Sequence, residues 1–325
     1  MWNRRQLIAT GAASLAACVA APAIAQNFPN RAVTMVVPFP AGGITDAVAR
    51  ALASKMGEQL GKPVIVDNRP GGGGQIAAAY VRQQATDGHT LYVGATEMFA
   101  INPSLFRNFS YDPLKDFSPV TSLIASPLVL VVPANSSLTS VKELIAQAKS
   151  RKDGLNFASQ GMGSIGHLLG ETFRGKVGGK FNHVAYKGSA PALQDVMGGQ
   201  VDFMFDPVIT TAPLVAGKKL KPLAIAADKR SPQMPEVPTL AELGVSGVNA
   251  GVWFGAVVKT GTTAVVVERL NDAIHQAMKD PEVVKRFADQ GMQAFPSTPA
   301  QFGSFMQSEL TKWGPLVKAS GASIE

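Results

Sequence analysis

The chain has 325 residues, of which 46% are hydrophobic and 16% are charged, so it can bury a large core. Its length suits two domains better than one. The formal net charge of +7 comes from scattered basic residues, without the basic stripe and interleaved aromatics that a nucleic-acid-binding surface needs. We therefore expect no nucleic-acid partner, whereas a modest positive field is compatible with anionic small ligands.

The first 25 residues have the three parts of an export signal. Arg4 and Arg5 supply a basic start, residues 7–17 form an apolar run too short to span a bilayer, and Ala-Ile-Ala at residues 23–25 is a small-residue cleavage site. The paired arginines followed by QLI also fit a twin-arginine signal, so the sequence leaves both the Sec and the twin-arginine route open. We expect residues 1–25 to be a signal peptide and the mature protein to be periplasmic.

Cys18 is the only cysteine, and it follows Leu-Ala-Ala, which is also the pattern of a lipoprotein cleavage site. Lipid anchoring at Cys18 is therefore the alternative to cleavage after Ala25. Cleavage after Ala25 leaves a chain without a disulfide, a thiol nucleophile or a sulfur ligand. It also removes two arginines and no acid, so the net charge falls from +7 to +5.

Strand-like and helix-like segments then alternate almost to the end of the chain. The apolar run at residues 31–39 predicts a strand, and the three- and four-residue spacing of apolar residues at 44–56 predicts a helix. A helix at residues 141–150 has Ser140 as its expected N-cap. Further strands are predicted at residues 62–68, 90–96, 128–133, 155–160, 183–188, 201–207 and 252–258, and further helices at residues 75–84, 97–106 and 269–291. This alternation favours an α/β fold with mostly parallel sheets.

The predicted elements divide into two sheets more readily than they form one. Residues 126–251 carry their own set of strands and helices, and the C-terminal tail adds one strand and further helices. We expect the tail to return to the first lobe. Lobe 1 is then discontinuous, with residues 26–125 plus 252–325, lobe 2 has residues 126–251, and the two crossing segments form a hinge.

A strand, a glycine turn and a helix meet at PFPAGGITDAVAR, residues 38–50. The first amides of a helix lack intrahelical acceptors and lie at the positive end of the helix dipole, so such a junction can bind an anion. Gly42 and Gly43 allow the backbone to approach a ligand closely. Asp46 has two possible roles here. It favours the helix dipole, or it faces the cleft and holds a ligand donor or an ordered water.

A second junction of this kind is GMGSIG at residues 161–166. It matches the dinucleotide-binding pattern between a strand and a helix, but Tyr186 and Lys187 stand where the ribose-binding acid should follow. A helix N-terminus for a smaller anion fits these residues better. Ser159 and Ser164 add hydroxyls that can donate to a carboxylate.

The third junction lies in YKGSAPALQDVMGGQVDFMFDP, which contains Lys187, Gly188 and Ser189 and ends at Asp206 and Pro207. Asp206 before a proline is either a turn former or a residue of the cleft. The glycines at 71–74 lack the Lys-Ser or Lys-Thr of a P-loop, so they indicate a tight connection.

The sequence nominates no catalytic or metal site. His89, His167, His183 and His275 are far apart and have no metal-ligand spacing, and no G-x-S-x-G motif occurs. We expect no cofactor, no metal and no enzymatic activity. An exported hydrolase of small carboxylate esters or amides, with residues assembled from distant segments, is the alternative.

Stretches spread over the whole mature chain resemble a known family. They are PFPAGGITDAVAR, DNRPGGGGQIAA, INPSLF, FASQGMGSIGHL, YKGSAPALQDVMGGQVD, SPQMPEVPTLAELG and RLNDAI with DPEVVKRFADQGM. In this order they resemble the Bug family, the extracytoplasmic solute receptors of tripartite tricarboxylate transporters. The resemblance implies a type II periplasmic-binding-protein fold, with two lobes of mixed sheet flanked by helices and a ligand cleft between them.

The resemblance also implies how the ligand is held. Residues 39–46 and 159–164 match the two opposed family loops that bind a ligand carboxylate, Thr96 ends a strand beside the cleft, and Asp206 sits at the distal ligand group. The expected ligand-binding residues are Phe39, Ala41, Gly42, Gly43, Thr45, Asp46, Thr96, Ser159, Gly161, Gly163, Ser164, Lys187, Gly188, Ser189 and Asp206. The segment ATEMFAINP departs from the more usual polar or aromatic neighbour of the cleft, so it affects ligand identity.

The partners follow from the same resemblance. We expect a monomeric receptor that binds a mono- or dicarboxylate, an acidic amino acid or an aromatic acid, and delivers it to a two-subunit membrane permease. Because the two loops contain no arginine, a tricarboxylate such as citrate would lack charge compensation. Delivery of the closed receptor to a sensor protein, in place of a permease, is the other possibility.

Overall fold

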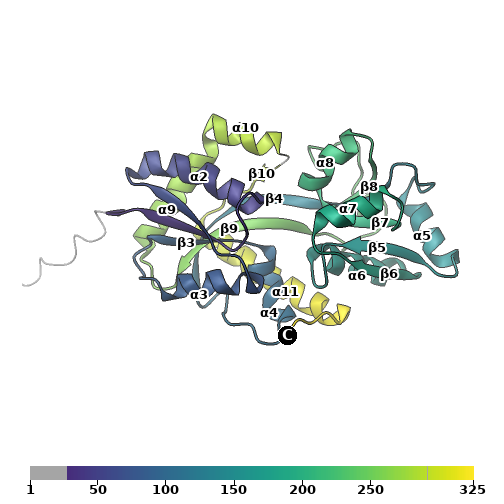
Figure 1. The fold of residues 1–325 in the computed structure, drawn as a ribbon, viewed down its shortest axis with the longest axis horizontal. Helices are drawn as coiled ribbons and strands as arrows, with labels where there is room; N and C mark the ends of the chain where they lie inside the picture. The colour runs from purple at the N-terminus through teal and green to yellow at the C-terminus, as the bar shows by residue number, and fades with distance from the viewer. Residues whose placement is uncertain (1–27, 291) are drawn as a thin grey trace, which may run out of the picture.

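The computed structural model describes residues 28–290 and 292–325, so the predicted signal peptide and Cys18 lie outside the described residues. Figure 1 shows two lobes, each a sheet covered by helices, joined by two long strands that run through the middle of the molecule. The predicted two-lobed α/β architecture is confirmed. None of the helices within the described ranges is long and apolar enough to cross a membrane.

Lobe 1 is built on a sheet with the strand order β2-β1-β3-β9-β4. Strands β1, β2 and β3 are parallel, and β9 is antiparallel to both of its neighbours. Its elements are β1 (Val33–Val37), α2 (Ile44–Leu60), β2 (Val64–Asn68), η2 (Gly72–Gly74), α3 (Gln75–Gln83), β3 (Thr90–Ala95), η3 (Glu97–Ile101), α4 (Asn102–Leu105), the first part of β4 (Phe117–Pro133), β9 (Gly251–Lys259), α9 (Ala264–Lys279), α10 (Pro281–Asp289), β10 (Gln293–Ala294) and α11 (Pro299–Ser320).

Lobe 2 is built on the order β8-β4-β7-β5-β6, in which β5 is parallel to β6 and β7 whereas β4 is antiparallel to β7 and β8. Its aromatic core includes Phe157, Phe173, Phe203 and Phe205, all fully buried. The elements of this lobe are α5 (Val141–Ser150), β5 (Leu155–Ser159), α6 (Ile165–Val177), β6 (Phe181–Ala185), α7 (Ser189–Met197), β7 (Phe203–Pro207), α8 (Val208–Ala216) and β8 (Leu220–Ala226).

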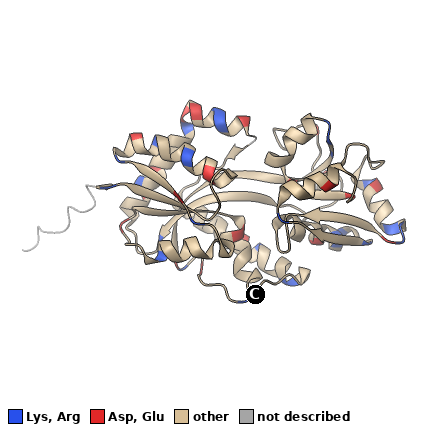
Figure 2. Cartoon of the chain, in the orientation of Figure 1, with Lys and Arg blue, Asp and Glu red and all other residues tan. Residues whose placement is uncertain are grey.

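Strands β4 and β9 connect the lobes. Residues 117–127 of β4 pair with β9, and residues 128–133 pair with β8, so one strand of 17 residues belongs to both sheets. The β4–β9 pairing shifts register between Pro119 and Thr121 and again between Ser122 and Ala125. Figure 2 shows both strands free of charged residues through the middle of the molecule. The predicted lobe boundaries fall on these strands, and the division itself stays a prediction.

Short polar sequences set the helix ends. The hydroxyl of Ser140 accepts the N–H of Glu143, which confirms the predicted N-cap of α5. Helix α11 begins with a reciprocal capping box between Thr298 and Gln301, and it ends at Gly321 in the left-handed conformation. These local signals fix where α5 and α11 begin.

Candidate functional site

A cavity of about 480 Å³ lies between the two lobes, which is a volume typical of small-ligand sites. Helices α2, α6, α7 and α8 all begin at its wall, where Ile44, Ile165, Ser189 and Ile209 of their first turns lie. Each of these helices follows a strand directly, so the carboxyl ends of β1, β5, β6 and β7 meet the cleft, as is usual for ligand sites in α/β folds.

The positive charge that faces the cavity comes from backbone N–H groups and not from basic side chains. Helix N-termini carry partial positive charge and unpaired N–H groups. In the described chain, no Lys, Arg or His side chain is part of the cavity wall. The same described residues hold no group of three or more His, Cys, Asp or Glu side chains arranged to bind a metal ion. The arrangement can bind an organic anion, and its wall offers no cation for a second negative charge.

The lobe 1 loop, residues 38–43, leaves the first amides of α2 free. Gly42 turns the chain into the helix with φ of +87°, and Gly43 is the N-cap but has no side chain to cap it. Within the described ranges, no acceptor is found for the N–H groups of Gly43, Ile44 and Thr45, which all line the cavity. These amides are the donors that lobe 1 offers to a ligand.

Asp46 stabilises this loop from the side that faces away from the cavity. Its carboxylate accepts the N–H of Gly42 at 2.9 Å, Nε of Arg50 at 2.9 Å and Nδ2 of Asn68 at 3.0 Å. The hydrogen bond from Arg50 lowers the pKa of Asp46 to about 2, against the opposing effect of burial. The Asn68 amide also contacts the carbonyl of Phe39 at 3.1 Å. The oxygens of Asp46 are thus occupied by protein donors, and its side chain ties α2, the loop and β2 together.

In the lobe 2 loop, residues 160–164, most backbone N–H groups donate to acceptors of the loop itself or of the start of α6. The N–H of Gly163 donates to Nδ1 of His167 at 3.1 Å, and the N–H of Ser164 donates to the Gly161 carbonyl at 3.1 Å. The Ser164 hydroxyl accepts the N–H of His167 at 3.3 Å, so it caps α6 and keeps its own hydrogen available. Lobe 2 therefore offers the Ser164 hydroxyl and the N–H of Ile165 at the cavity wall.

Two neutral histidines support this loop. The rings of His167 and His183 stack with their centroids 3.9 Å apart, and Nε2 of His183 lies 2.6 Å from the hydroxyl oxygen of Ser159. That hydroxyl also accepts the N–H of Gly161 at 3.1 Å, so Ser159 shapes the loop. Burial lowers the pKa of both histidines, for His167 to about 4 with a further contribution from His183. Because both rings are uncharged near neutral pH, His167 can serve as the acceptor for Gly163.

Asp206, on β7 of the same lobe, lies fully buried behind the lobe 2 wall. It accepts hydrogen bonds from Nε2 of Gln160 at 2.6 Å, from the hydroxyl of Ser189 at 2.7 Å and from the hydroxyl of Thr210. Burial raises the pKa of Asp206 to about 6, and the three hydrogen bonds partly oppose this shift. Its three donors line the cavity, so Asp206 orients residues that face the ligand space.

Glu97 is the one ionisable side chain in the wall among the residues that the structure describes. It follows β3 and begins η3, a π-helical turn, which is an element often found at functional sites. In the described part of the chain its carboxylate meets no cation and no donor except its own backbone amide, and burial raises its pKa. Sequence reasoning marked the segment ATEMFAINP as unusual but did not nominate Glu97.

The predicted site residues divide between the wall and the layer behind it. Those in the wall are Phe39, Ala41, Gly43, Thr45, Ser164, Gly188 and Ser189. Those outside it are Gly42, Asp46, Thr96, Ser159, Gly161, Gly163, Lys187 and Asp206. Pro40, Ile44 and Gln160 of the wall lie within the two predicted loops but were not named as ligand-binding residues. Wall residues outside the predicted site are Ala95, Glu97, Ile165, Pro207, Ile209, Thr210, Val252 and Phe254. Contact of any of them with a ligand stays a prediction.

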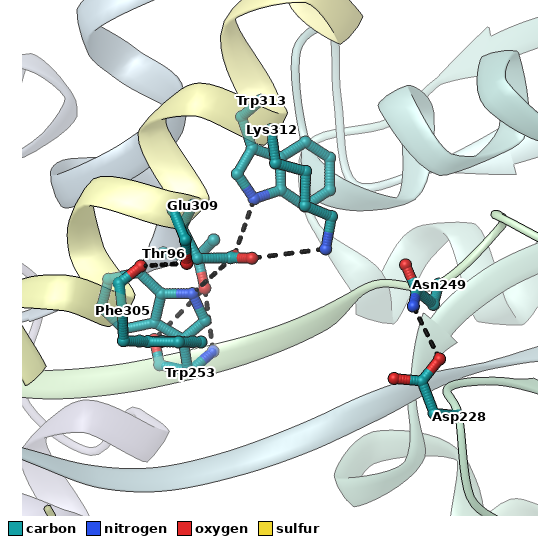
Figure 3. A network of polar contacts seen from close by, with 9 residues as sticks. Thr96, Asp228, Asn249, Trp253, Phe305, Glu309, Lys312 and Trp313 are labelled. Carbon is teal, nitrogen blue, oxygen red and sulfur yellow. Dashed lines mark hydrogen bonds and ion pairs between the residues drawn. The ribbon is translucent and has the colours of Figure 1, made fainter. Parts of the chain in front are cut away.

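Thr96 lies in a buried network between lobe 1 elements (Figure 3). Its Oγ1 accepts the N–H of Trp253 at 2.8 Å. The indoles of Trp253 and Trp313 both donate to Glu309 at 2.9 Å, and Lys312 lies 3.3 Å from the same carboxylate. This network ties the end of β3 and the connecting strand β9 to α11, so Thr96 fixes the floor of the cleft.

A second cavity of about 520 Å³ lies against the same connecting strands, next to Glu309 and Lys312. Its wall includes Asp228 and Asn249, which hydrogen-bond to each other at 2.9 Å (Figure 3). None of the described helices begins among its lining residues. The candidate anion site is therefore the cleft at the helix N-termini, and not this slightly larger cavity.

A family model for the tripartite tricarboxylate transporter family receptor matches residues 48–322. The chain belongs to this receptor family. It is 37% identical over 322 residues to protein BugT of Bordetella pertussis, with 99% of each chain covered. The resemblance to the Bug receptors of this family is thereby confirmed.

Two solved structures of related proteins have the same fold as this chain. The periplasmic binding protein BugD has a TM-score of 0.76 at 32% identity, covering 92% of this chain and 100% of its own. Protein Rpa4515 of R. palustris, solved with adipate, has a TM-score of 0.79 at 34% identity, covering 91% of this chain and 99% of its own. The predicted periplasmic-binding-protein fold is confirmed by these similarities.

Proposed function

We propose that this chain is a periplasmic receptor that captures one small carboxylate between its lobes and delivers it to the two-subunit permease of a tripartite tricarboxylate transporter. The observation that carries the proposal is the convergence of the N-termini of α2, α6, α7 and α8 on one cavity, in a family of transport receptors. Backbone N–H groups at helix N-termini bind a carboxylate without a cationic side chain. Binding and release then follow closure and opening of the lobes.

The ligand class is a small organic acid held by the free amides of residues 43–45 on lobe 1 and by Ser164 and Ile165 on lobe 2. The related protein Rpa4515 was solved with adipate, a small carboxylate, and this supports the proposed ligand class. We propose that the receptor acts as a monomer, needs no cofactor, and reaches the periplasm through the signal peptide at residues 1–25.

The contact between Ser159 and His183 does not favour the hydrolase alternative. A serine nucleophile must reach its substrate, whereas Ser159 is fully buried and lies outside the cavity wall. Its hydroxyl is also engaged by the N–H and the carbonyl of Gly161, at 3.1 and 3.0 Å. These contacts support a structural role for the serine–histidine pair in the loop.

Native mass spectrometry of the purified receptor tests the proposal, because a tightly held ligand co-purifies. We expect a bound small organic acid. A panel of carboxylates paired with their neutral primary amides is then screened by melting temperature, since a ligand of the folded state stabilises it by mass action. Acids should raise the melting temperature and their amides should not. Equal stabilisation by the amides, or formation of a hydrolysis product, would refute the proposal.

A further inference from the structure

A bound carboxylate and Glu97 would place two negative charges in one cavity. Among the residues that the structure describes, Glu97 is the one ionisable side chain in the cleft wall. The residue is half-buried, so solvent reaches its charge while the cleft is open. The ligand that the proposed function requires is an anion at neutral pH as well.

The elements that pack against η3 supply no cation to Glu97. Of these elements, β3, α4 and η2 contain no Asp, Glu, Lys, Arg or His, and the phenol of Tyr92 on β3 is uncharged at neutral pH. Helix α11 carries Glu309 and Lys312, which pair with each other at 3.3 Å, and the exposed Lys318. Burial raises the pKa of Glu97, and no charge of the described residues opposes this shift.

The positive groups around the rest of the cavity are used elsewhere. Arg50, behind the lobe 1 wall, is paired with Asp46 at 2.9 Å, and Lys187 beside the lobe 2 wall is exposed to solvent. Asp206 behind the lobe 2 wall is a further acid. The helix N-termini remain, and the ligand carboxylate occupies them. Binding should therefore raise the pKa of Glu97 further, by repulsion and by displacement of water from its side chain.

We propose that the receptor takes up one proton from solvent when it binds its carboxylate, and that Glu97 receives this proton. This rests on the proposed function, which supplies the carboxylate. The protonated side chain gains an O–H donor that it can direct to an oxygen of the ligand. At a separation on the order of 6 Å and an effective dielectric constant of about 20, repulsion between two carboxylates would weaken binding about 100-fold. Uptake of the proton removes this repulsion.

The affinity should consequently fall as the pH rises. Below the pKa that Glu97 has in the ligand-free receptor, the side chain is already protonated and the affinity is constant. Above this pKa each binding event consumes a proton, so Kd should rise about ten-fold per pH unit over about two units. At still higher pH the charged pair forms and the affinity is constant again.

Isothermal titration calorimetry on ligand-free receptor between pH 5.5 and pH 8.5 tests this. Pairs of buffers that differ in enthalpy of ionisation, such as MOPS and Tris, give the number of protons taken up. The probe is the most tightly bound of hexanoate, adipate and the other carboxylates of the screening panel. We expect uptake to approach about one proton where Kd changes most steeply. Binding without uptake would overturn the inference and leave the proposed function standing, whereas failure of every carboxylate to bind would refute both.

Variants identify the group that receives the proton. Glu97→Gln should bind the probe without uptake, and at pH 8.5 at least about ten-fold more tightly than the wild type. Glu97→Asp should keep the uptake. Glu268→Gln, an exposed acid on α9 outside the cavity, is the matched control and should change nothing. Asp206→Asn should also keep the uptake. Loss of uptake in Asp206→Asn but not in Glu97→Gln would assign the proton to Asp206 and overturn the inference.

Discussion

The carboxylate of Asp46 accepts the backbone N–H of Gly42, four residues earlier, at 2.9 Å. This bond folds the lobe 1 loop against the first turn of α2, and Arg50 and Asn68 complete the ring of donors around the carboxylate. The free amides at residues 43–45 lie between these two bonded positions. Asp46 therefore places the ligand donors without lining the cavity itself.

Replacement of Asp46 by alanine should weaken ligand binding at least about ten-fold, because the loop loses the acceptor that positions it. The free energy of unfolding should fall by about 1–3 kcal/mol, since the donors of Arg50 and Asn68 lose their partner. Calorimetry and urea denaturation measure the two effects. Asp272→Ala, an exposed acid on α9, is the control. Unchanged affinity in Asp46→Ala would remove Asp46 from any role at the site.

Acid should destabilise the fold through His167 between about pH 6.5 and pH 4. The pKa of His167 falls from 6.5 to about 4 on folding, so in this window the unfolded chain binds a proton that the folded chain does not. The free energy of unfolding contributed by this group therefore decreases as the pH falls and levels off below about 4. Urea denaturation at a series of pH values should show a shallower decrease in His167→Gln than in the wild type.

Titration of Asp206 changes the free energy of unfolding in the opposite direction, over a pH range that overlaps the range of His167. Its folded pKa is raised from 3.8 to about 6, so the folded chain takes up the proton first and gains stability as the pH falls through about 6. The difference between wild type and Asp206→Asn should therefore favour the wild type more at pH 4 than at pH 7. Identical pH profiles would show that Asp206 is not the buried titrating group.

Removal of the Glu309 carboxylate should destabilise lobe 1. Trp253 and Trp313 are nearly fully buried, and both indole N–H groups depend on this acceptor. Glu309→Ala leaves two buried donors unpaired, at a cost of roughly 2–5 kcal/mol in urea denaturation followed by tryptophan fluorescence. Glu309→Gln retains a carbonyl acceptor and should cost clearly less. Equal losses in the two variants would contradict this role.

A methyl group at Gly163 should hinder closure of the lobes. Gly163 in the lobe 2 loop has φ of +75°, and a Cβ there would lie 2.5 Å from the side chain of Leu105 in lobe 1. Gly163→Ala should therefore weaken binding by both strain and collision, whereas Gly42→Ala has no atom within 4 Å and meets strain alone. Calorimetry of Gly163→Ala with Leu105→Ala should show partial recovery of affinity. No recovery would mean that the collision is unimportant.

Local sequence signals predicted most of the fold. The apolar spacing of α2 and the Ser140 cap of α5 both depend on residues close in sequence, and both are found. Strand β8 was missed because it contains Pro222, a residue unusual inside a sheet. The expected mostly parallel sheets are mixed, because β4 and β9 cross between the lobes antiparallel to each other.

The residues that support the cavity wall without lining it could not be predicted from one sequence. Asp46 bonds to Asn68 over 22 residues, and Asp206 bonds to Gln160 over 46. The stacking of His167 on His183 likewise depends on neighbouring elements and has no spacing pattern. Sequence reasoning found the glycine-edged loops because helix starts are local features. It missed Glu97 because only the folded chain shows that no cation accompanies it.

The two register shifts between β4 and β9 give the connection between the lobes mechanical compliance. A regular ladder resists bending, whereas interrupted pairing allows a local change of strand direction with few inter-strand bonds stretched. Between the two shifts, where Thr121 and Ser122 pair with β9, their hydroxyls also bond to Ser297, at 2.9 and 2.8 Å, just before α11 begins. Bending of the strands there would therefore also move Ser297 and the start of α11.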